Sequence, residues 1–254
     1  MRVGIVQLGG QDLGDPAARR AAAAEQIAGV ADVRLLMLPE LWPVGFFHFD
    51  DYVAAAEDPD GPTTEFAAGV ARSRACWVHG GSFVERDGAD LFNSSVLVDP
   101  TGQVRLRYRK RHLFGYRSRE SELLTPGSDL PTIELDALTV GAATCYDLRF
   151  PELFRSLVDA GAQCFLITSA WPAARLSHWR ILARARALEN LCWLVACNTA
   201  GSDDGTTMAG HSIVVDPLGE VVAEADERPQ VLVADLDVDR VTECRSQFPF
   251  LADR

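Results

Sequence analysis

The sequence predicts an α/β fold, and more specifically a four-layer α-β-β-α sandwich. Short apolar, β-branched runs alternate with helical runs rich in Ala, Arg and Glu. Such alternation favours helices layered on sheets over an all-β protein. One hairpin motif occurs in both halves of the chain, which indicates two similar sheet-and-helix units packed together. Because 48% of the 254 residues are hydrophobic, the chain can bury a full core, and we expect residues 1–254 to form a single domain.

The strands and helices are predicted from these runs in chain order. The strand segments are short, apolar and enriched in β-branched residues; they are 3–8, 33–38, 76–83, 94–98, 104–108, 138–144, 163–168, 192–198, 212–215, 221–223 and 231–235. The helical segments are 16–30, 64–74, 151–160 and 177–190. Thr63 or Thr64 is the expected N-cap of the second helix and Ser177 that of the fourth, because a hydroxyl oxygen can accept from the first turn.

The repeated hairpin spans residues 94–104 in the first half and 211–221 in the second. Each copy reads as a strand, an Asp-Pro-x-Gly turn and a return strand. Proline presets the backbone at the second turn position, and glycine accepts the left-handed conformation that such a turn needs. The matching polarity along both copies favours a true repeat over two chance turns.

The charge balance and the cysteines limit the partners and the compartment. A formal net charge of -12 repels phosphate backbones, so we expect no nucleic-acid partner. No apolar run approaches the roughly 18–20 residues that span a bilayer. Residues 2–8 form a strand pattern without the basic and apolar regions of a secretory signal. Six cysteines at irregular spacing indicate reduced thiols and a cytoplasmic protein.

Lys110 is the only lysine among 24 basic residues. Arginine stands on both sides of it, at Arg109 and Arg111, so the position does not simply require positive charge. An ammonium is a compact point charge on a flexible stem, whereas guanidinium is a planar fork. A tight polar site that needs an ammonium is therefore one explanation for Lys110, and chance survival in an arginine-rich composition is the other.

Cys145 follows the apolar strand 138–144 and precedes Pro151, which suits the first turn of a helix. At such a strand-to-helix turn, the thiol projects from the edge of the sheet and the next backbone N–H, that of Tyr146, can face a developing oxyanion. The other cysteines occupy less distinctive positions: Cys76, Cys164, Cys192 and Cys197 lie in apolar runs typical of buried thiols, and Cys244 lies near the C-terminus.

Glu40 directly follows the apolar segment 35–39, and Lys110 follows the return strand of the first hairpin. Glu40 is a candidate general base, with an ordinary turn residue as the alternative. Together with Cys145, these residues place a carboxylate, an ammonium and a thiol at strand ends, where open α/β sheets bind their ligands.

Three segments, 38–40, 108–114 and 145–152, resemble the nitrilase or carbon–nitrogen hydrolase superfamily. The resemblance extends over nearly the whole chain and includes residues 185–190, 210–212, Arg245 and Pro249. It implies the α-β-β-α fold already inferred, a catalytic triad of glutamate, lysine and cysteine, and pairing of two copies through outer helices. The tail, about residues 241–254, is then expected at the interface of a homodimer or a larger even-numbered assembly.

Carried over to this sequence, the resemblance makes Glu40 the base, Lys110 the stabilising cation and Cys145 the nucleophile. A second family glutamate precedes a Pro-Gly turn; Glu120 matches it better than its neighbour Glu122. Sulfur would attack a carboxamide, ammonia would leave a thioester behind, and water would release the acid. This chemistry requires neither a metal nor an organic cofactor.

The residues after Cys145 are similar to those of the amidase branch that includes omega-amidases. Residues 169–172, which include Trp171, together with Arg175, His178 and Trp179, resemble the pocket lining of that branch. Arg175 or Arg149 could bind the free carboxylate of a small omega-amide, a bidentate pairing that suits arginine. A structural ion pair is the favoured alternative for Arg149. His112 and His178 could equally be supporting residues at the edge of the site.

Two alternatives remain open from the sequence. An N-carbamoyl amine or amino-acid hydrolase, or a nitrilase, could use the same triad. A protein of another class, a non-enzymatic interaction or nucleotide-binding protein, is suggested faintly by Gly9 and Gly10 after the first strand. No complete phosphate-binding motif follows these glycines, so the hydrolase is preferred.

Overall fold

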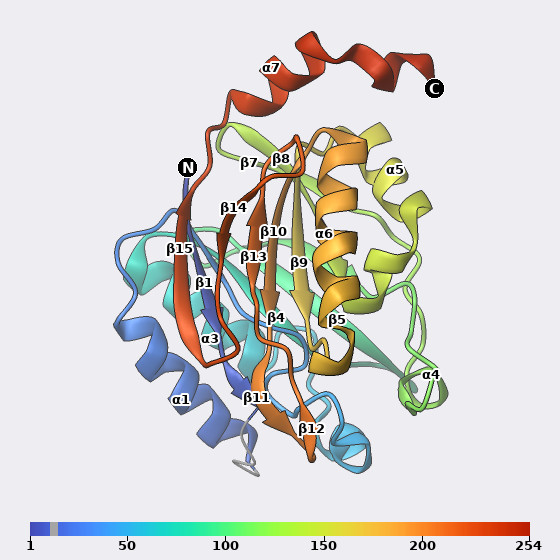
Figure 1. Ribbon diagram of the computed structural model, residues 1–254. Coiled ribbons are helices and arrows are strands. Elements are labelled where there is room, and N and C mark those ends of the chain that lie inside the picture. Colours follow the sequence, from blue (N-terminus) through green and yellow to red (C-terminus); the bar gives the residue numbers. More distant parts are fainter. Residues whose placement is uncertain (11–14) are drawn as a thin grey trace.

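The computed structural model describes residues 1–10 and 15–254 (Figure 1). Within these residues the strands form two six-stranded sheets and one three-stranded sheet. The order in the first large sheet is β15 (Gln230–Asp235), β1 (Arg2–Gln7), β3 (Leu35–Met37), β4 (Trp77–Asp87), β5 (Asp90–Val98), β6 (Val104–Arg109). The order in the second is β14 (Val221–Glu224), β13 (Ile213–Val215), β10 (Trp193–Asn198), β9 (Cys164–Ser169), β8 (Leu138–Thr144), β7 (Thr132–Leu135).

The two large sheets pack face to face, and helices cover their outer faces (Figure 1). One hydrophobic cluster lies between the sheets and draws side chains from both, such as Leu35 and Leu166. The long helices are α1 (Pro16–Ala28), α3 (Pro62–Arg74), α5 (Pro151–Asp159) and α6 (Leu176–Asn190). Buried residues of α1 and α3 pack on the first sheet and those of α5 and α6 on the second. The predicted four-layer α-β-β-α sandwich is confirmed.

The repeated hairpin forms in both sheets, as β5–β6 and as β13–β14. In each turn the aspartate N–H donates to a backbone carbonyl across the turn. Asp99 donates to the carbonyl of Gln103 and Asp216 to that of Glu220, both at 2.9 Å. The glycines Gly102 and Gly219 have φ angles of 86° and 80°, the left-handed conformation that favours glycine. The two copies therefore agree in backbone conformation as well as in sequence.

Both predicted helix caps are wrong. The second helix begins two residues earlier than predicted, with Pro62 at its first position and Gly61 as N-cap, since proline lacks the N–H that a first helical position does not need. Thr63 and Thr64 lie inside the first turn, where their hydroxyls bond to Glu57 and to the carbonyl of Pro59. The fourth helix continues from the 3-10 turn η3 (Ala173–Arg175), which places Ser177 within the helix and Arg175 at the cap.

Several short elements were not predicted because each is too short to show a period. They are β2 (Gly9–Gly10), β11 (Ala200–Asp203), β12 (Thr206–Thr207), α2 (Tyr52–Ala55), α4 (Glu120–Leu123), β7 and the 3-10 helix η1 (Phe49–Asp51). Gly9 and Gly10 pair with β11 in the small sheet β12-β11-β2. They form a strand and not the phosphate loop considered above.

The C-terminal segment continues from β15 into α7 (Arg240–Gln247) and η4 (Pro249–Asp253), which extend along one end of the sandwich (Figure 1). Arg245 connects this segment to the sandwich, because its guanidinium donates a hydrogen bond to the carbonyl of Ala162 at 2.9 Å. Phe248 and Phe250 remain exposed beyond α7. None of the described helices combines the length and apolar composition that crossing a bilayer requires.

Candidate active site

The segments that follow β3, β6 and β8 converge at one end of the sandwich. Glu40 comes three residues after β3, Lys110 directly follows β6, and Cys145 directly follows β8. Glu40 and Lys110 are 1% and 0% exposed, and Cys145 is 7% exposed. Three reactive groups from distant parts of the chain are thus brought together in a largely buried site.

The ammonium of Lys110 joins two carboxylates. Its Nζ lies 2.8 Å from Oε1 of Glu40 and 2.8 Å from Oε1 of Glu120. The Nδ2 of Asn93 donates to the same two oxygens at 2.9 Å. Glu120 is fully buried, whereas Glu122 is exposed on α4. The geometry therefore places Glu120, and not Glu122, against the lysine.

The buried charges shift the pKa values of Lys110 and Glu120. Burial alone would lower the pKa of Lys110, but the charges of Glu120 and Glu40 outweigh burial and raise it. Lys110 accordingly stays an ammonium at neutral pH. Burial raises the pKa of Glu120, and repulsion by Glu40 adds to this rise while Lys110 opposes it. One ammonium is therefore shared by two buried carboxyl groups.

Cys145 stands at a sharp turn between β8 and the 3-10 helix η2 (Cys145–Arg149), and its φ of 46° is in the left-handed region. Such a conformation costs free energy in a residue other than glycine, and it is found at sites where a reactive side chain must project from the sheet. Burial raises the pKa of the thiol and Glu40 adds to the rise, while Lys110 opposes it. The resting group is therefore a thiol that needs a base.

Asp147 holds this turn in place. Its Oδ2 accepts from the N–H of Thr144 at 2.9 Å and from the Tyr108 hydroxyl at 2.7 Å. Its Oδ1 accepts from the N–H of His112 at 3.0 Å and lies 2.7 Å from the His112 Nδ1. The His112 ring also stacks on Phe150. His112 is thus a supporting residue of the turn, one of the two roles considered for it.

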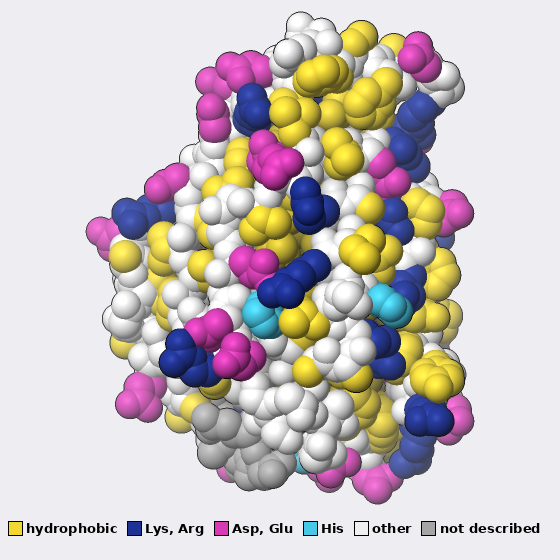
Figure 2. Space-filling view, in the orientation of Figure 1, with side chains coloured by type: hydrophobic (Ala, Val, Ile, Leu, Met, Phe, Trp, Pro, Cys, Tyr) yellow, Lys and Arg dark blue, Asp and Glu magenta, His cyan; other side chains and the backbone are white. Residues whose placement is uncertain are grey.

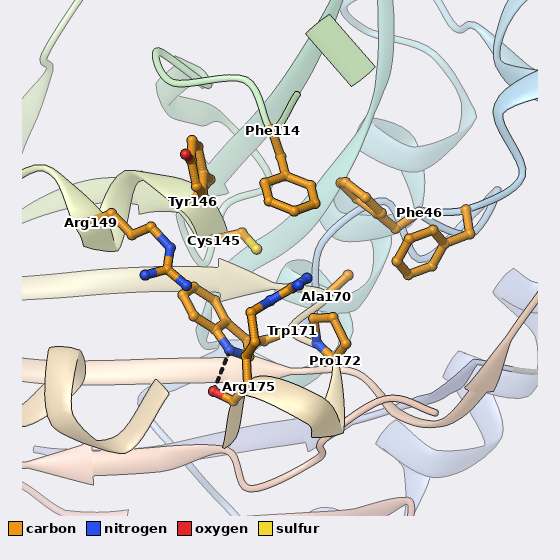
Figure 3. Close-up of a pocket in the computed structure, with 10 residues that line it drawn as sticks. Phe46, Phe114, Cys145, Tyr146, Arg149, Ala170, Trp171, Pro172 and Arg175 are labelled. Atoms are coloured by element: carbon orange, nitrogen blue, oxygen red, sulfur yellow. Dashed lines mark hydrogen bonds between the residues drawn. The ribbon is translucent and has the colours of Figure 1, made fainter. Parts of the chain in front are cut away.

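The Cys145 sulfur points into an aromatic pocket (Figure 3). The volume of this pocket is about 320 Å³ when the solvent space at its opening is included. The predicted residues Trp171, Arg175 and Arg149 line it beside Cys145 and Tyr146. Ala170 and Pro172, from the segment that resembles the pocket lining of the amidase branch, also line it, and Phe46, Phe47 and Phe114, which the sequence analysis missed, complete the lining. His178 does not line this pocket; it is exposed on α6 and contacts Arg149 at 3.2 Å.

Both pocket arginines face aromatic rings. The Arg149 guanidinium lies 5.0 Å from the Trp171 ring, and that of Arg175 lies 5.2 Å from the Phe114 ring. Over the described ranges 1–10 and 15–254, neither guanidinium lies within ion-pairing distance of a carboxylate. The structural ion pair favoured for Arg149 is therefore absent from this part of the chain, and both cations are available to an anionic ligand.

Two supporting residues were also missed, and only weak signals marked them. Asn93 stands at the polar start of an otherwise apolar strand, and Asp147 stands two residues after the candidate nucleophile. Both are fully buried. A polar residue beside a reactive strand end is the signal that could have found them, because a buried polar group requires a partner.

The chain is similar to known proteins along its whole length. The carbon–nitrogen hydrolase family model matches residues 2–246. A 2-oxoglutaramate amidase of Paenarthrobacter nicotinovorans is 40% identical over 90% of this chain and 80% of its own. The omega-amidase NIT2 of Mus musculus is 31% identical over 100% of this chain and 94% of its own.

Solved structures agree with this assignment. A superfamily member from Xanthomonas campestris, with an arsenic adduct in its active site, has a TM-score of 0.93 at 31% identity over 100% of this chain and 97% of its own. A mutant amidase from Nesterenkonia sp. carries the acetamide moiety of fluoroacetamide covalently at its active-site cysteine; its TM-score is 0.84 at 26% identity over 98% and 95%. The prediction of an amidase-like enzyme is confirmed, and the chain belongs to the carbon–nitrogen hydrolase family.

Proposed function

We propose that this enzyme hydrolyses the terminal amide of a small dicarboxylic acid through a thioester on Cys145, releasing ammonia. The observation that carries the proposal is the position of Cys145 between two environments. On one side lies the buried cluster of Glu40, Lys110 and Glu120. On the other lies an aromatic pocket with two arginines that have no carboxylate partner among the described residues.

The pocket suits a small amide that also bears a carboxylate. Aromatic walls exclude water and leave room for a short acyl chain, and a guanidinium binds a carboxylate through two parallel hydrogen bonds. Arg175 and Arg149 are the proposed carboxylate ligands, and Trp171 is a proposed wall. His178 is proposed to act only through its contact with Arg149. The amidase relatives support this substrate class, since 2-oxoglutaramate carries both an amide and a carboxylate.

In the first half-reaction, Glu40 takes the proton of the Cys145 thiol as sulfur attacks the amide carbon. The carbonyl oxygen becomes an oxyanion, which the Lys110 charge and the Tyr146 N–H stabilise; a single such donor is worth about 3–4 kcal/mol of barrier. The carbon–nitrogen bond then breaks, and Glu40 returns the proton to the departing ammonia. Glu120 keeps Lys110 charged and in position throughout.

In the second half-reaction, Glu40 takes a proton from water, whose oxygen attacks the thioester. The carbon–sulfur bond breaks, the carboxylic acid leaves, and the proton returns to the sulfur. The covalent adduct on the cysteine of the related amidase from Nesterenkonia sp. supports Cys145 as the nucleophile.

The test is a panel of small omega-amides, N-carbamoyl compounds and nitriles, scored for ammonia and carbon dioxide release. We expect omega-amides to release ammonia alone, and intact-protein mass spectrometry to detect the acyl group on the wild-type chain. Cys145→Ala should abolish both signals, whereas the matched control Cys76→Ala, a buried cysteine outside the pocket, should retain them. Full turnover by Cys145→Ala would refute the covalent mechanism, and carbon dioxide release would favour the carbamoyl hydrolase.

We also propose a cytoplasmic homodimer or larger even-numbered assembly, formed through the outer helices and the tail. Exposed apolar side chains support such an interface: Ile181 and Leu188 on α6, Val222 on β14, and Phe248 and Phe250 in the tail. Figure 2 shows hydrophobic side chains gathered near the C-terminal segment. Light scattering should give at least twice the mass of one chain, and Ile181→Asp should lower it; a monomeric wild type would contradict the proposal.

A further inference from the structure

A second, smaller cavity adjoins Glu40. Its lining residues are Leu8, Gly9, Gly10, Arg19, Glu40, Trp42, Gly45, Phe46, Thr199 and Asp203. Cys145 does not line it, and Glu40 does not line the aromatic pocket; Phe46 lines both. Glu40 therefore borders the small cavity, and Phe46 lies between this cavity and the pocket that holds the nucleophile.

The size and the walls of this cavity suit one water molecule. The space open to the centre of a water molecule is about 10 Å³ here and about 20 Å³ in the aromatic pocket; about 10 Å³ is the minimum for a single water. A buried water also needs two to four polar partners, and Glu40, Thr199, Asp203 and the main chain offer them. Ammonia has nearly the same size and hydrogen-bonding capacity, so the same space accepts either molecule.

Glu40 retains an acceptor position for such a molecule. Among the described residues, three donors reach its carboxylate: Lys110 Nζ and Asn93 Nδ2 bond to Oε1, and the Ala170 N–H bonds to Oε2. A carboxylate offers about four acceptor positions. The remaining position, on Oε2, is the one that a general base needs for the proton it takes from thiol and then from water.

Two glycines of the cavity lining stand where neighbouring atoms come too close for a side chain. A Cβ on Gly10 would lie 2.5 Å from the Ser202 carbonyl oxygen, and one on Gly45 would lie 2.5 Å from Oδ1 of Asp203. Gly45 also has a φ of 91°, which other residues rarely adopt. Gly10 was one basis of the nucleotide-binding alternative. In the structure it is part of the cavity lining that also includes Glu40.

We propose that this cavity exchanges ammonia for water at Glu40 while the acyl group still occupies the aromatic pocket. The inference rests on the proposed amidase function. Once the thioester forms, the acyl chain lies between Cys145 and the pocket mouth, so the molecules that leave and enter at Glu40 need another position. Ammonia moves from Glu40 into the cavity and leaves through the surface cavity that shares Leu8, Gly9, Arg19 and Trp42 with it. A water that enters from the same side then takes its place. That water gives its proton to Glu40 as its oxygen attacks the thioester carbon and the carbon–sulfur bond breaks.

The test fills the cavity and separates the two half-reactions. Thr199→Leu enlarges a side chain that lines the cavity but does not line the aromatic pocket. Thr64→Leu is the matched control, because Thr64 is also buried and also bonds a backbone carbonyl through its hydroxyl. Rapid quenching with intact-protein mass spectrometry gives the rate of thioester formation and the fraction of enzyme acylated at steady state.

We expect Thr199→Leu to form the thioester at the wild-type rate, to accumulate it, and to lower kcat roughly tenfold. Thr64→Leu should match wild type in both measurements. Equal acyl-enzyme fractions in the two folded variants would overturn the proposal. If wild type neither forms the thioester nor releases ammonia from any amide, the proposed function itself fails.

If Thr199→Leu does not fold, a crystal structure of the wild-type enzyme decides. An ordered water in the cavity within hydrogen-bond distance of the Glu40 carboxylate would support the exchange site. A cavity without an ordered water there would overturn it.

Discussion

The ammonium of Lys110 lies 2.8 Å from a carboxylate oxygen of Glu120, and both side chains are completely buried. Since Glu40 contacts the same nitrogen, one cation holds two carboxylates in fixed positions. The cost of burying these charges is offset only because each has a partner at hydrogen-bond distance. The chain's single lysine therefore stands where a compact cation is required, and where a planar fork would have to displace at least one of its neighbours.

Lys110→Arg should lower kcat by about 10²–10³, the usual effect of losing a stabilising donor at an oxyanion. The larger guanidinium cannot occupy the space between Glu40 and Glu120 without moving them. Ammonia release under saturating substrate measures kcat, and the adjacent Arg111→Lys is the control. Normal turnover by Lys110→Arg would mean that the identity of the cation is unimportant.

Asp147→Asn should both destabilise the fold and reduce activity. The buried carboxylate accepts from Tyr108, Thr144 and His112, and an amide replaces one of its acceptor oxygens with a donor. We expect a loss of about 3 kcal/mol in the free energy of unfolding, measured by urea denaturation. Tyr108→Phe, which removes only one of these bonds, should cost about 1–2 kcal/mol. Equal losses in the two variants would contradict the assigned role of Asp147.

Much of the fold and part of the site could be predicted because they follow from local pattern. The hydrophobic period and the composition predicted the layers, and the Asp-Pro-x-Gly turns predicted both hairpins. Glu40, Lys110 and Cys145 each follow a strand directly or closely, so a strand prediction also predicts where their side chains emerge. The predicted N-caps failed, because a helix boundary depends on one residue and Pro62 shifted it.

The rest depends on contacts between distant segments. Asn93 reaches Glu40 and Glu120 only because the β5–β6 register sets its carbonyl 2.8 Å from the Lys110 N–H. Phe46 lies in a segment of turns without a period, and its position beside Lys110 comes from packing. Residue patterns give the face of a strand, but they do not give the register between strands or the packing of a loop against another sheet.

Arg175→Ala should raise KM for a carboxylate-bearing omega-amide roughly 10- to 100-fold, the loss expected for one charge-assisted hydrogen-bonded pair. Arg149→Ala should act in the same direction. An uncharged amide of similar length is the control substrate, and its KM should not change in either variant. A rise for both substrates would mean that the arginines shape the pocket and do not bind the carboxylate. No rise for either would remove them from substrate binding.

His79 should make the folded state sensitive to acid. It is fully buried on β4, and neither ring nitrogen has a hydrogen-bond partner among the described residues. Burial lowers the pKa of His79 from 6.5 to about 4. The His79 imidazole therefore binds a proton below pH 6.5 in the unfolded chain, but only below about pH 4 in the folded chain. The stability associated with neutral His79 is complete above pH 6.5 and is lost as the pH falls toward 4.

As the pH falls from 6.5 to 4, the loss in the free energy of unfolding should approach about 3 kcal/mol. Urea denaturation at pH 7 and pH 5, for wild type and His79→Leu, isolates the effect, because the carboxylates that also titrate are common to both proteins. We expect the wild type to lose more stability than His79→Leu between the two pH values. The leucine keeps an apolar side chain between Met37 and Leu97, the cross-strand neighbours of His79. Identical pH dependence in the two proteins would show that His79 takes up its proton without opening the core.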